Sequence, residues 1–356
     1  MRKAAFANLV VVLVVAALIP FANFVIDPFN RNMKWNLGLR KDGVYGRDQF
    51  RARIANYTGL RYPLLLLGDS RMAPVPADLV SRYAGGSWFN LAYPGGSLKD
   101  AVDSFWYADS LTALRRVCLG LSAANFQNAT PPSQVEAAIN IQRSRAGMWD
   151  YIDPLTTQSS LEALLLTYGL IGERRRNDPA FRMYQDPQLE SMLQNAALAA
   201  ANSAATWKYP SEILREIREM GLRCREKNIK LEIIFFPEPQ RVTKVRQRAW
   251  GDDYTRLLAD LRAVAPMYFY DYPNRITENT ANFRDAVHFR DDVADSIVME
   301  VFGGMRWLAQ YSEPDSQNIS LLNSASAQRE TDRTISIRPF VAQGRRNNTT
   351  ATGINP

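Results

Sequence analysis

The 356-residue sequence predicts an α/β protein in which helices cover both faces of a mainly parallel sheet. Short apolar runs bounded by Gly, Pro or Asp alternate along the chain with longer segments whose apolar residues recur every three or four positions. The first pattern is typical of buried strands and the second of helices. A composition of 46% hydrophobic and 22% charged residues adds that the chain can bury a sizeable core.

An uncharged N-terminal segment predicts a membrane anchor over residues 1–26. Residues 4–26 carry no charge, and about 20 apolar residues suffice for a helix to cross a bilayer. A cleaved signal peptide is the alternative, but Pro20 stands where a cleavage site requires a small residue. Basic residues flank both ends and leave the orientation open. We expect the large domain outside the cytoplasm, because long domains translocate largely regardless of charge.

The chain beyond the anchor divides into a link and a domain. Residues 27–61 show no sustained period, and we expect an irregular linker there; residues 62–311 carry the α/β alternation. The apolar runs predict strands at 62–67, 88–92, 116–121, 230–236 and 267–270. The helical spacing predicts helices at 98–114, 211–227 and 253–264, and a closing helix at 291–311.

Two segments depart from this alternation. Residues 127–209 contain helical stretches such as 160–171 and 188–205, interrupted by prolines, with no strand pattern. They are too long for a simple crossover, so we expect a helical insertion that either borders a site or packs as a plain subdomain. Residues 312–356 are rich in Ser, Asn, Gln, Thr and Arg with few large apolar residues, which predicts a disordered tail.

Composition also limits the partners and cofactors. The net charge of +7 and an isoelectric point near 9.4 suit an anionic membrane surface or an acidic polymer. Basic residues are spread without a nucleic-acid-binding motif, so no nucleic-acid partner is predicted. No phosphate-binding glycine loop follows a strand, and a single histidine with two isolated cysteines makes no zinc cluster; no cofactor and no metal are predicted. Cys118 and Cys224 are expected as buried thiols or, in an oxidising compartment, as a disulfide.

A serine follows the first predicted strand of the domain. The run Leu64–Met72 leads four leucines into Gly68, Asp69 and Ser70. In a parallel sheet, reactive groups collect beyond the carboxyl ends of the strands, and a glycine there lets the backbone turn sharply. Ser70 is therefore a candidate nucleophile, the alternative being a strand that ends in a polar turn. Arg71 either attracts an anionic substrate or caps the sheet edge.

The only histidine of the chain lies near the other end of the predicted domain. Asp285 and His288 stand three residues apart, so one turn of chain brings carboxylate and imidazole to the same side. A serine hydroxyl needs a base to take its proton and a third group to fix the tautomer of that base. The sequence therefore indicates Ser70 as nucleophile, His288 as base and Asp285 as its orienting group.

These two stretches resemble the first and last blocks of the SGNH (GDSL-type) hydrolase superfamily. The resemblance implies a three-layer α/β/α sandwich and covers roughly residues 62–311, with its specific motifs at the two ends. One membrane segment followed by Asp27-Pro28 is similar to membrane-anchored SGNH-like proteins of bacterial envelope acylation, among them the alginate O-acetylation proteins and the D-alanyl transfer protein of teichoic acid. That branch implies a single-pass protein of the bacterial inner membrane with a periplasmic domain.

The resemblance also implies an oxyanion hole. The family's middle blocks supply a glycine N–H and an asparagine side chain, which here correspond to Gly95 in the stretch 89–97 and Asn125 in the stretch 119–125. With the N–H of Ser70 they would stabilise a tetrahedral oxyanion. Gly95 could equally serve a turn before the helix at 98, and Asn125, which follows Gly120 at a longer spacing than usual, could cap its own turn.

Three functions remain open at this point. The first is an envelope O-acyltransferase that passes an acyl group from Ser70 to a polysaccharide, tethered through residues 4–26 beside a membrane-bound acyl donor protein. The second is a membrane-anchored esterase or deacetylase that uses the same triad on a polysaccharide or an acylated small molecule. The third is a non-catalytic envelope protein that keeps the fold.

Overall fold

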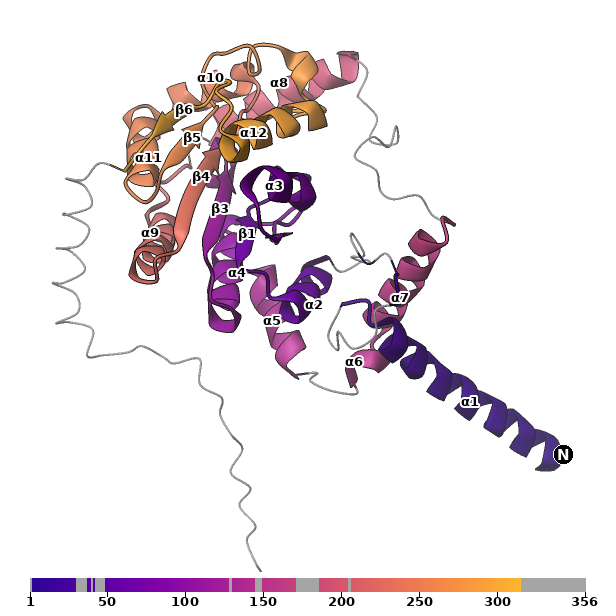
Figure 1. Ribbon diagram of the computed structural model, residues 1–356. Helices are drawn as coiled ribbons and strands as arrows, with labels where there is room; N and C mark the ends of the chain where they lie inside the picture. Colours follow the sequence, from indigo (N-terminus) through magenta and orange to yellow (C-terminus); the bar gives the residue numbers. More distant parts are fainter. Residues whose placement is uncertain are drawn as a thin grey trace, which may run out of the picture. The chain divides into compact units, whose positions relative to one another are not determined.

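The computed structural model has the predicted α/β class, with a mostly parallel six-stranded sheet (Figure 1). The sheet order is β2-β1-β3-β4-β5-β6; β1 to β5 run parallel and β6 pairs antiparallel with β5. The strands are β1 (Leu64–Leu67), β2 (Trp88–Asn90), β3 (Arg116–Leu121), β4 (Lys230–Phe235), β5 (Met267–Phe269) and β6 (Gln310–Ser312). The structure describes residues 2–29, 37–39, 41, 49–127, 130–144, 149–170, 186–203 and 206–314.

Two apolar clusters lie on opposite faces of this sheet. Successive side chains of a strand point to opposite faces, so Leu65 and Leu67 join the larger cluster while Leu64 and Leu66 join the smaller one. The larger cluster is completed mainly by α2 (Gln49–Leu60), α4 (Leu98–Leu111), α5 (Gln134–Ser144), α9 (Ser211–Glu226) and α11 (Asp252–Arg262). The smaller one is completed by α3 (Ala77–Ala84) and α12 (Asp291–Gly303).

Helix α2 corrects the expectation of an irregular linker over residues 27–61. Its residues Phe50, Ile54 and Tyr57, spaced four and three apart, are buried in the larger cluster. Arginines between them dilute the apolar pattern, and one of them, Arg53, is itself buried and donates from Nη1 to the carbonyl oxygen of Asn90. Part of the predicted linker, residues 30–36, 40 and 42–48, lies outside the described residues.

The prediction that the closing helix extends to residue 311 is also wrong. Helix α12 ends at Gly303, where Gly304 adopts a left-handed conformation with φ of 72°. The Glu300 carboxylate then accepts the backbone N–H groups of Trp307, Leu308 and Ala309, which turns the chain back into β6. The predicted tail begins within this strand, at Ser312, and its residues 315–356 lie outside the described residues.

Within the described part of residues 127–209 the insertion is helical. Helix α5 packs against α2 and α4, helices α6 and α7 contact α1, and α8 packs against α10. Because its helices contact three different parts of the chain, the insertion is not one separate bundle. The bounds are α1 (Arg2–Ile26), α6 (Trp149–Ile152), α7 (Pro154–Thr167), α8 (Asp186–Ser203) and α10 (Gln240–Trp250).

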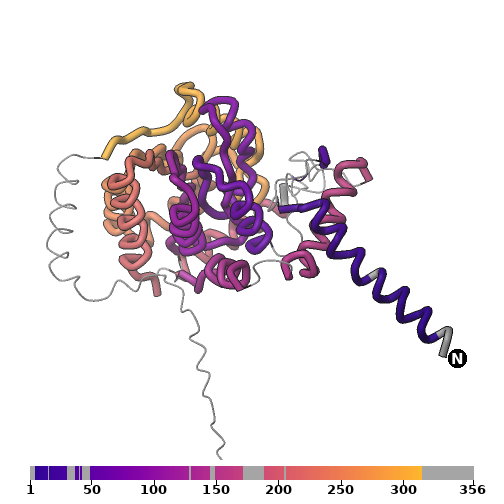
Figure 2. Tube along the Cα trace, turned by 60° about the horizontal axis from the view of Figure 1, so that its bottom comes forward, coloured from indigo at the N-terminus to yellow at the C-terminus, as the bar shows by residue number. Residues whose placement is uncertain are grey.

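Helix α1 is long and apolar enough to cross a membrane, a test that a signal sequence also passes. The 22 residues from Ala5 to Ile26 would span about 33 Å at 1.5 Å per residue, close to the thickness of a bilayer core. The large apolar side chains described between Phe6 and Phe24 are exposed, and Figure 2 traces this helix at the N-terminus of the chain.

The two cysteines are free and buried on opposite faces of the sheet. Cys118 of β3 lies in the smaller apolar cluster and Cys224 of α9 in the larger one. The sheet therefore separates them, and of the two expectations the buried thiols are correct.

Gly68, directly after β1, has a φ of 152° and no room for a side chain. A Cβ there would lie 2.8 Å from the carbonyl oxygen of Gly120, which is backbone and cannot rotate away.

We expect Gly68→Ala to lower the free energy of unfolding by more than about 2 kcal/mol. The matched control is Gly304→Ala, where a Cβ meets nothing within 4 Å, so only the left-handed backbone is strained and about 1 kcal/mol is lost. Thermal unfolding of the full chain in detergent measures both losses. Equal losses of unfolding free energy in the two variants contradict the prediction.

Candidate active site

Strand β1 carries Ser70 to the carboxyl edge of the sheet. The four leucines of β1 are at most 8% exposed, and Gly68 then brings the chain against Gly120 of β3. The carbonyl oxygen of Gly68 accepts the N–H of Tyr93 at 3.1 Å, which joins the turn after β1 to the loop after β2. Ser70 follows in the same turn, two residues after Gly68, and is half-buried.

The strand order makes this edge a natural place for a site. Strands β2 and β3 flank β1, so the connections that leave β1 and β3 diverge on opposite sides of the sheet. In doubly wound sheets of order 2-1-3-4-5, ligands bind in the crevice outside the carboxyl ends of β1 and β3. Ser70 follows β1 and Asn125 follows β3, so both flank this crevice.

A tight loop before α12 presents His288. Phe283 and Phe289 form an isolated antiparallel bridge at the base of the loop, and the N–H of Arg284 donates to the carbonyl oxygen of His288 at 2.8 Å. Phe289 packs against Phe236, with the ring centroids 5.2 Å apart. The loop is thereby held against the end of β4, and the histidine stands beside the turn that follows β1.

Ser70, His288 and Asp285 form one continuous hydrogen-bond chain. The distance from Ser70 Oγ to His288 Nε2 is 2.7 Å, and that from His288 Nδ1 to Asp285 Oδ2 is also 2.7 Å. The contact expected between the hydroxyl and the imidazole is therefore present across a separation of 218 residues. The side chain of His288 is 33% exposed and that of Asp285 is 21% exposed.

Asp285 is held as a carboxylate by the loop that it shapes. Burial by itself raises the pKa of Asp285, but the hydrogen bond and charge of His288 and the N–H groups of Val287 and His288 outweigh burial, and the pKa lies below its usual value. Both N–H groups donate to Asp285 Oδ1 at 2.8 Å. An ionised Asp285 favours the tautomer with a proton on Nδ1, which leaves the Nε2 lone pair facing Ser70.

Two backbone N–H groups at the site have no hydrogen-bond partner among the described residues, those of Ser70 and Gly95. Gly95 is exposed, with a φ of 71°, in the loop between β2 and α4. This loop is joined to the turn after β1 through Tyr93 and Gly68, and its Ser97 caps α4. An oxyanion role for the two N–H groups remains a prediction.

Asn125 is oriented by the residue before the serine. Its Oδ1 accepts the N–H of Ser122 and its Nδ2 donates to Asp69 Oδ2, both at 2.7 Å. Asn125 thus caps the short helix Ala123–Phe126, as the alternative interpretation requires. Its amide carries two N–H bonds, however, so the bond to Asp69 leaves a second donor. The predicted oxyanion role is compatible with this geometry and stays a prediction.

Arg71 lies inside the protein and joins the two halves of the site. It is 4% exposed; Nη1 donates to Asp69 Oδ2 at 2.6 Å, and Nε donates to the carbonyl oxygen of Val287 at 3.2 Å. Its Nη2 lies 3.7 Å from Glu238. Its charge is therefore matched by protein carboxylates, which favours the structural interpretation over attraction of an anionic substrate.

Glu238 is a site-supporting residue that the sequence analysis missed. It is fully buried, accepts the N–H of Ala124 at 2.9 Å, and pairs with Arg246 of α10. Burial opposes its charge, but Arg246 and Arg71 outweigh burial and lower the pKa of Glu238. It follows β4 just as Asp69 follows β1, so the rule about the carboxyl ends of parallel strands could have found it.

Part of the helical insertion borders the loop that carries Asp285 and His288. Ala286, between Asp285 and His288, is buried in a small apolar cluster with Leu189 and Leu193 of α8 and Val242 of α10. Of the two interpretations of the insertion, bordering the site therefore applies to α8. Among the described residues no group of three or more His, Cys, Asp or Glu side chains could hold a metal ion.

Comparisons with known proteins add no relative: no family model matches the chain, and neither does any curated protein.

Replacing Arg71 is expected to destabilise the chain, because it strips Asp69 and Glu238 of their shared buried cation. Arg71→Ala should lower the free energy of unfolding by about 3–5 kcal/mol, the usual cost of leaving a buried charge unpaired. Arg82→Ala is the matched control: Arg82 is exposed, lies 3.9 Å from Asp78, and should contribute less than about 1 kcal/mol. Denaturant unfolding of the two variants measures the difference. Equal losses of unfolding free energy would show that Arg71 does not stabilise the buried carboxylates.

Proposed function

We propose that the chain is a membrane-anchored serine acyltransferase of the SGNH type that O-acetylates a cell-envelope or exported polysaccharide outside the cytoplasm. The hydrogen-bond chain from Ser70 through His288 to Asp285 carries the acyl-transfer part of the proposal. A serine hydroxyl, an imidazole and a carboxylate in this order are the arrangement that makes a weak nucleophile reactive near neutral pH.

In the first step, Ser70 Oγ attacks the carbonyl carbon of an ester while its proton passes to His288 Nε2. The imidazolium is stabilised by Asp285, whose carboxylate lies 2.7 Å from Nδ1. The tetrahedral intermediate collapses when the carbon–oxygen bond to the leaving alcohol breaks and His288 returns its proton to that alcohol. The acyl group then remains as an ester on Ser70.

The oxyanion of this intermediate needs hydrogen-bond donors. The N–H groups of Ser70 and Gly95 and the second N–H of Asn125 are the donors that we assign to it. Each such donor contributes on the order of 3 kcal/mol to the transition state, or about a hundredfold in rate.

In the second step, His288 takes a proton from an acceptor hydroxyl, which attacks the carbonyl carbon of the acyl-serine. The bond from that carbon to Ser70 Oγ then breaks, and His288 returns the proton to Oγ. A sugar hydroxyl as acceptor gives an acylated polysaccharide, and water gives hydrolysis. We favour the sugar, because the resemblance to envelope-acylation proteins and a helix able to cross the membrane both fit a site held near a membrane-bound acyl donor.

We infer a three-layer α/β/α sandwich of the SGNH type, periplasmic and carried by α1 in the bacterial inner membrane. The apolar clusters on both faces of the sheet and the nucleophile at the end of β1 support this inference.

An esterase with the same triad is the second candidate. The partial exposure of His288, whose side chain is 33% accessible, favours it because water can approach the base. The acceptor alone distinguishes this candidate from the transferase.

Ser70→Ala should abolish acyl chemistry while leaving the fold intact, since Ser70 is half-buried and its hydroxyl bonds only to His288 among the described residues. Release of p-nitrophenol from p-nitrophenyl acetate by the full chain should fall at least about 10³-fold, as when a triad member is removed. A fluorophosphonate probe should label Ser70 in the unmodified chain. The control is Ser110→Ala, an exposed serine of α4 that bonds to the carbonyl of Tyr107. The proposal of an enzyme is refuted if Ser70→Ala and Ser110→Ala release p-nitrophenol equally, or if the unmodified chain releases none.

The acceptor is identified by the acetyl content of the envelope polysaccharide in cells. With a transferase, Ser70→Ala in the chromosome lowers that content; with an esterase, the same change raises it. We expect a decrease, because a tethered site hands its acyl group to a nearby glycan. An unchanged content combined with retained ester hydrolysis in vitro would leave only an esterase of another substrate.

A further inference from the structure

Helices α6 and α7, with the residues that directly follow α7, expose five large apolar side chains. We call these five residues the α6–α7 face: Trp149 (71% exposed), Ile152 (50%), Leu161 (56%), Tyr168 (72%) and Leu170 (71%). Leu161 of α7 and Tyr168, the C-cap of this helix, are seven positions apart and therefore lie on the same side of it. Single exposed apolar residues are ordinary, but five within 22 residues form a surface that water solvates poorly.

The charges of this segment do not offset its apolar character. Residues 149–170 contain no Lys or Arg. Of their three acids, Asp150 and Asp153 are buried, and Asp153 pairs with Arg51 at 2.5 Å. Glu162, partly exposed, is the third. A helix of this kind differs from a solvent-facing helix, which carries charged residues on its outer side.

The same helices enclose the last turns of α1. Asn23 Nδ2 donates to the carbonyl oxygen of Tyr151 at 2.7 Å and to Thr157 Oγ1 at 2.8 Å. The rings of Phe24 and Tyr151 pack edge to face, with centroids 5.3 Å apart. Ile26 is buried with Ala163 and Leu166 of α7. The contacts therefore involve the end of α1 that leads into the rest of the chain.

This location sets the depth of the α6–α7 face. When α1 crosses a bilayer, its 22 apolar residues extend about 33 Å, so Asn23 and Ile26 come to the boundary between acyl chains and headgroups. Side chains packed beside them are at the same boundary. Trp and Tyr are enriched at that depth because their rings are apolar and their polar atoms stay hydrated.

We propose that the α6–α7 face lies in the headgroup region of the bilayer, so that these two helices seat the chain on the membrane surface beside its anchor. The proposal rests on the membrane-anchored state of the proposed function, but not on acyl chemistry. It assigns to this part of the insertion a lipid surface as its partner, whereas α8 borders the candidate active site.

Packing connects the seat to the sheet. Leu155 of α7 and Phe29 form a buried cluster with Ala52 and Ala55 of α2. Helix α2 in turn packs in the larger apolar cluster, and its Arg53 bonds to Asn90 at the end of β2. The bilayer contact would therefore orient the carboxyl edge of the sheet with respect to the membrane, as a donor held in the same membrane requires.

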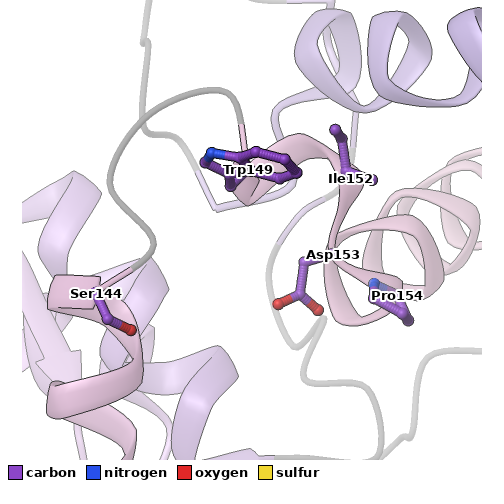
Figure 3. A pocket seen from close by; sticks show the side chains of 5 residues that line it. All are labelled: Ser144, Trp149, Ile152, Asp153 and Pro154. Atoms are coloured by element: carbon purple, nitrogen blue, oxygen red, sulfur yellow. The ribbon is translucent and has the colours of Figure 1, made fainter.

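A hollow of about 320 Å³ opens at the start of this surface (Figure 3). Trp149 and Ile152 line it together with Ser144 of α5, Asp153 and Pro154. Its lining residues include none of the triad, so the hollow belongs to the proposed membrane seat and not to the catalytic centre.

The test compares two leucines of equal exposure in the full-length chain. Leu161→Cys places a thiol on the α6–α7 face, and Leu198→Cys, at 54% exposure in place of 56%, places one on α8. Each is labelled with the fluorophore NBD; the native cysteines are buried and stay unlabelled in the folded protein. The chains are reconstituted in vesicles with lipids that carry a nitroxide near the headgroup. We expect at least threefold stronger quenching at position 161 than at position 198.

Quenching at position 161 that is no stronger than at position 198 overturns the proposal. So does protection of position 161 by a second copy or by another membrane protein, shown by crosslinking without lipid quenching. Repeating the measurement in a Ser70→Ala background separates the two proposals. Retained quenching in both backgrounds, with acyl release that Ser70→Ala abolishes, supports both proposals. Absent quenching with normal acyl release in the chain that keeps Ser70 removes only the membrane seat, and acyl release that Ser70→Ala leaves unchanged removes only the acyl chemistry.

Discussion

A buried guanidinium connects two segments that are more than two hundred residues apart in the sequence. Arg71 is held by Asp69 on its own turn and reaches across to the carbonyl oxygen of Val287. Ser70 stands directly before Arg71 and His288 directly after Val287, so this bridge helps to hold the two side chains at hydrogen-bond distance. Glu238 and Arg246 extend the bridge to the end of β4 and to α10. The site thus depends on internal ion pairing as well as on the sheet.

The strands and the triad could be predicted because their signals are local. An apolar run that stops at a glycine indicates a strand end, and a lone histidine three residues after an aspartate indicates a candidate base. The missed elements have signals that are spread over the fold. In helix α2 the apolar spacing is obscured by arginines such as Arg53, whose partner lies in β2. Glu300 turns the chain into β6 by accepting backbone N–H groups, and such contacts leave no pattern in the sequence. The contacts of Glu238 similarly form only when the loops after β1, β3 and β4 come together.

The helical insertion is one segment in sequence but serves two surroundings. Its middle encloses the end of α1, whereas α8 packs on α10 and beside Ala286. Such a division explains why periodicity identified the segment as helical without showing its role, since both surroundings require apolar helix faces. The neighbouring elements, and not the helices themselves, distinguish the proposed lipid surface from the border of the candidate active site.

The two cysteines bear on how the chain matures. Burial raises the pKa of both thiols, that of Cys224 to about 12, so the reactive thiolate form is scarce at neutral pH. The intervening sheet also prevents them from meeting. Folding therefore requires no thiol-oxidising enzyme, and the two buried thiols are equally compatible with a reducing and an oxidising compartment.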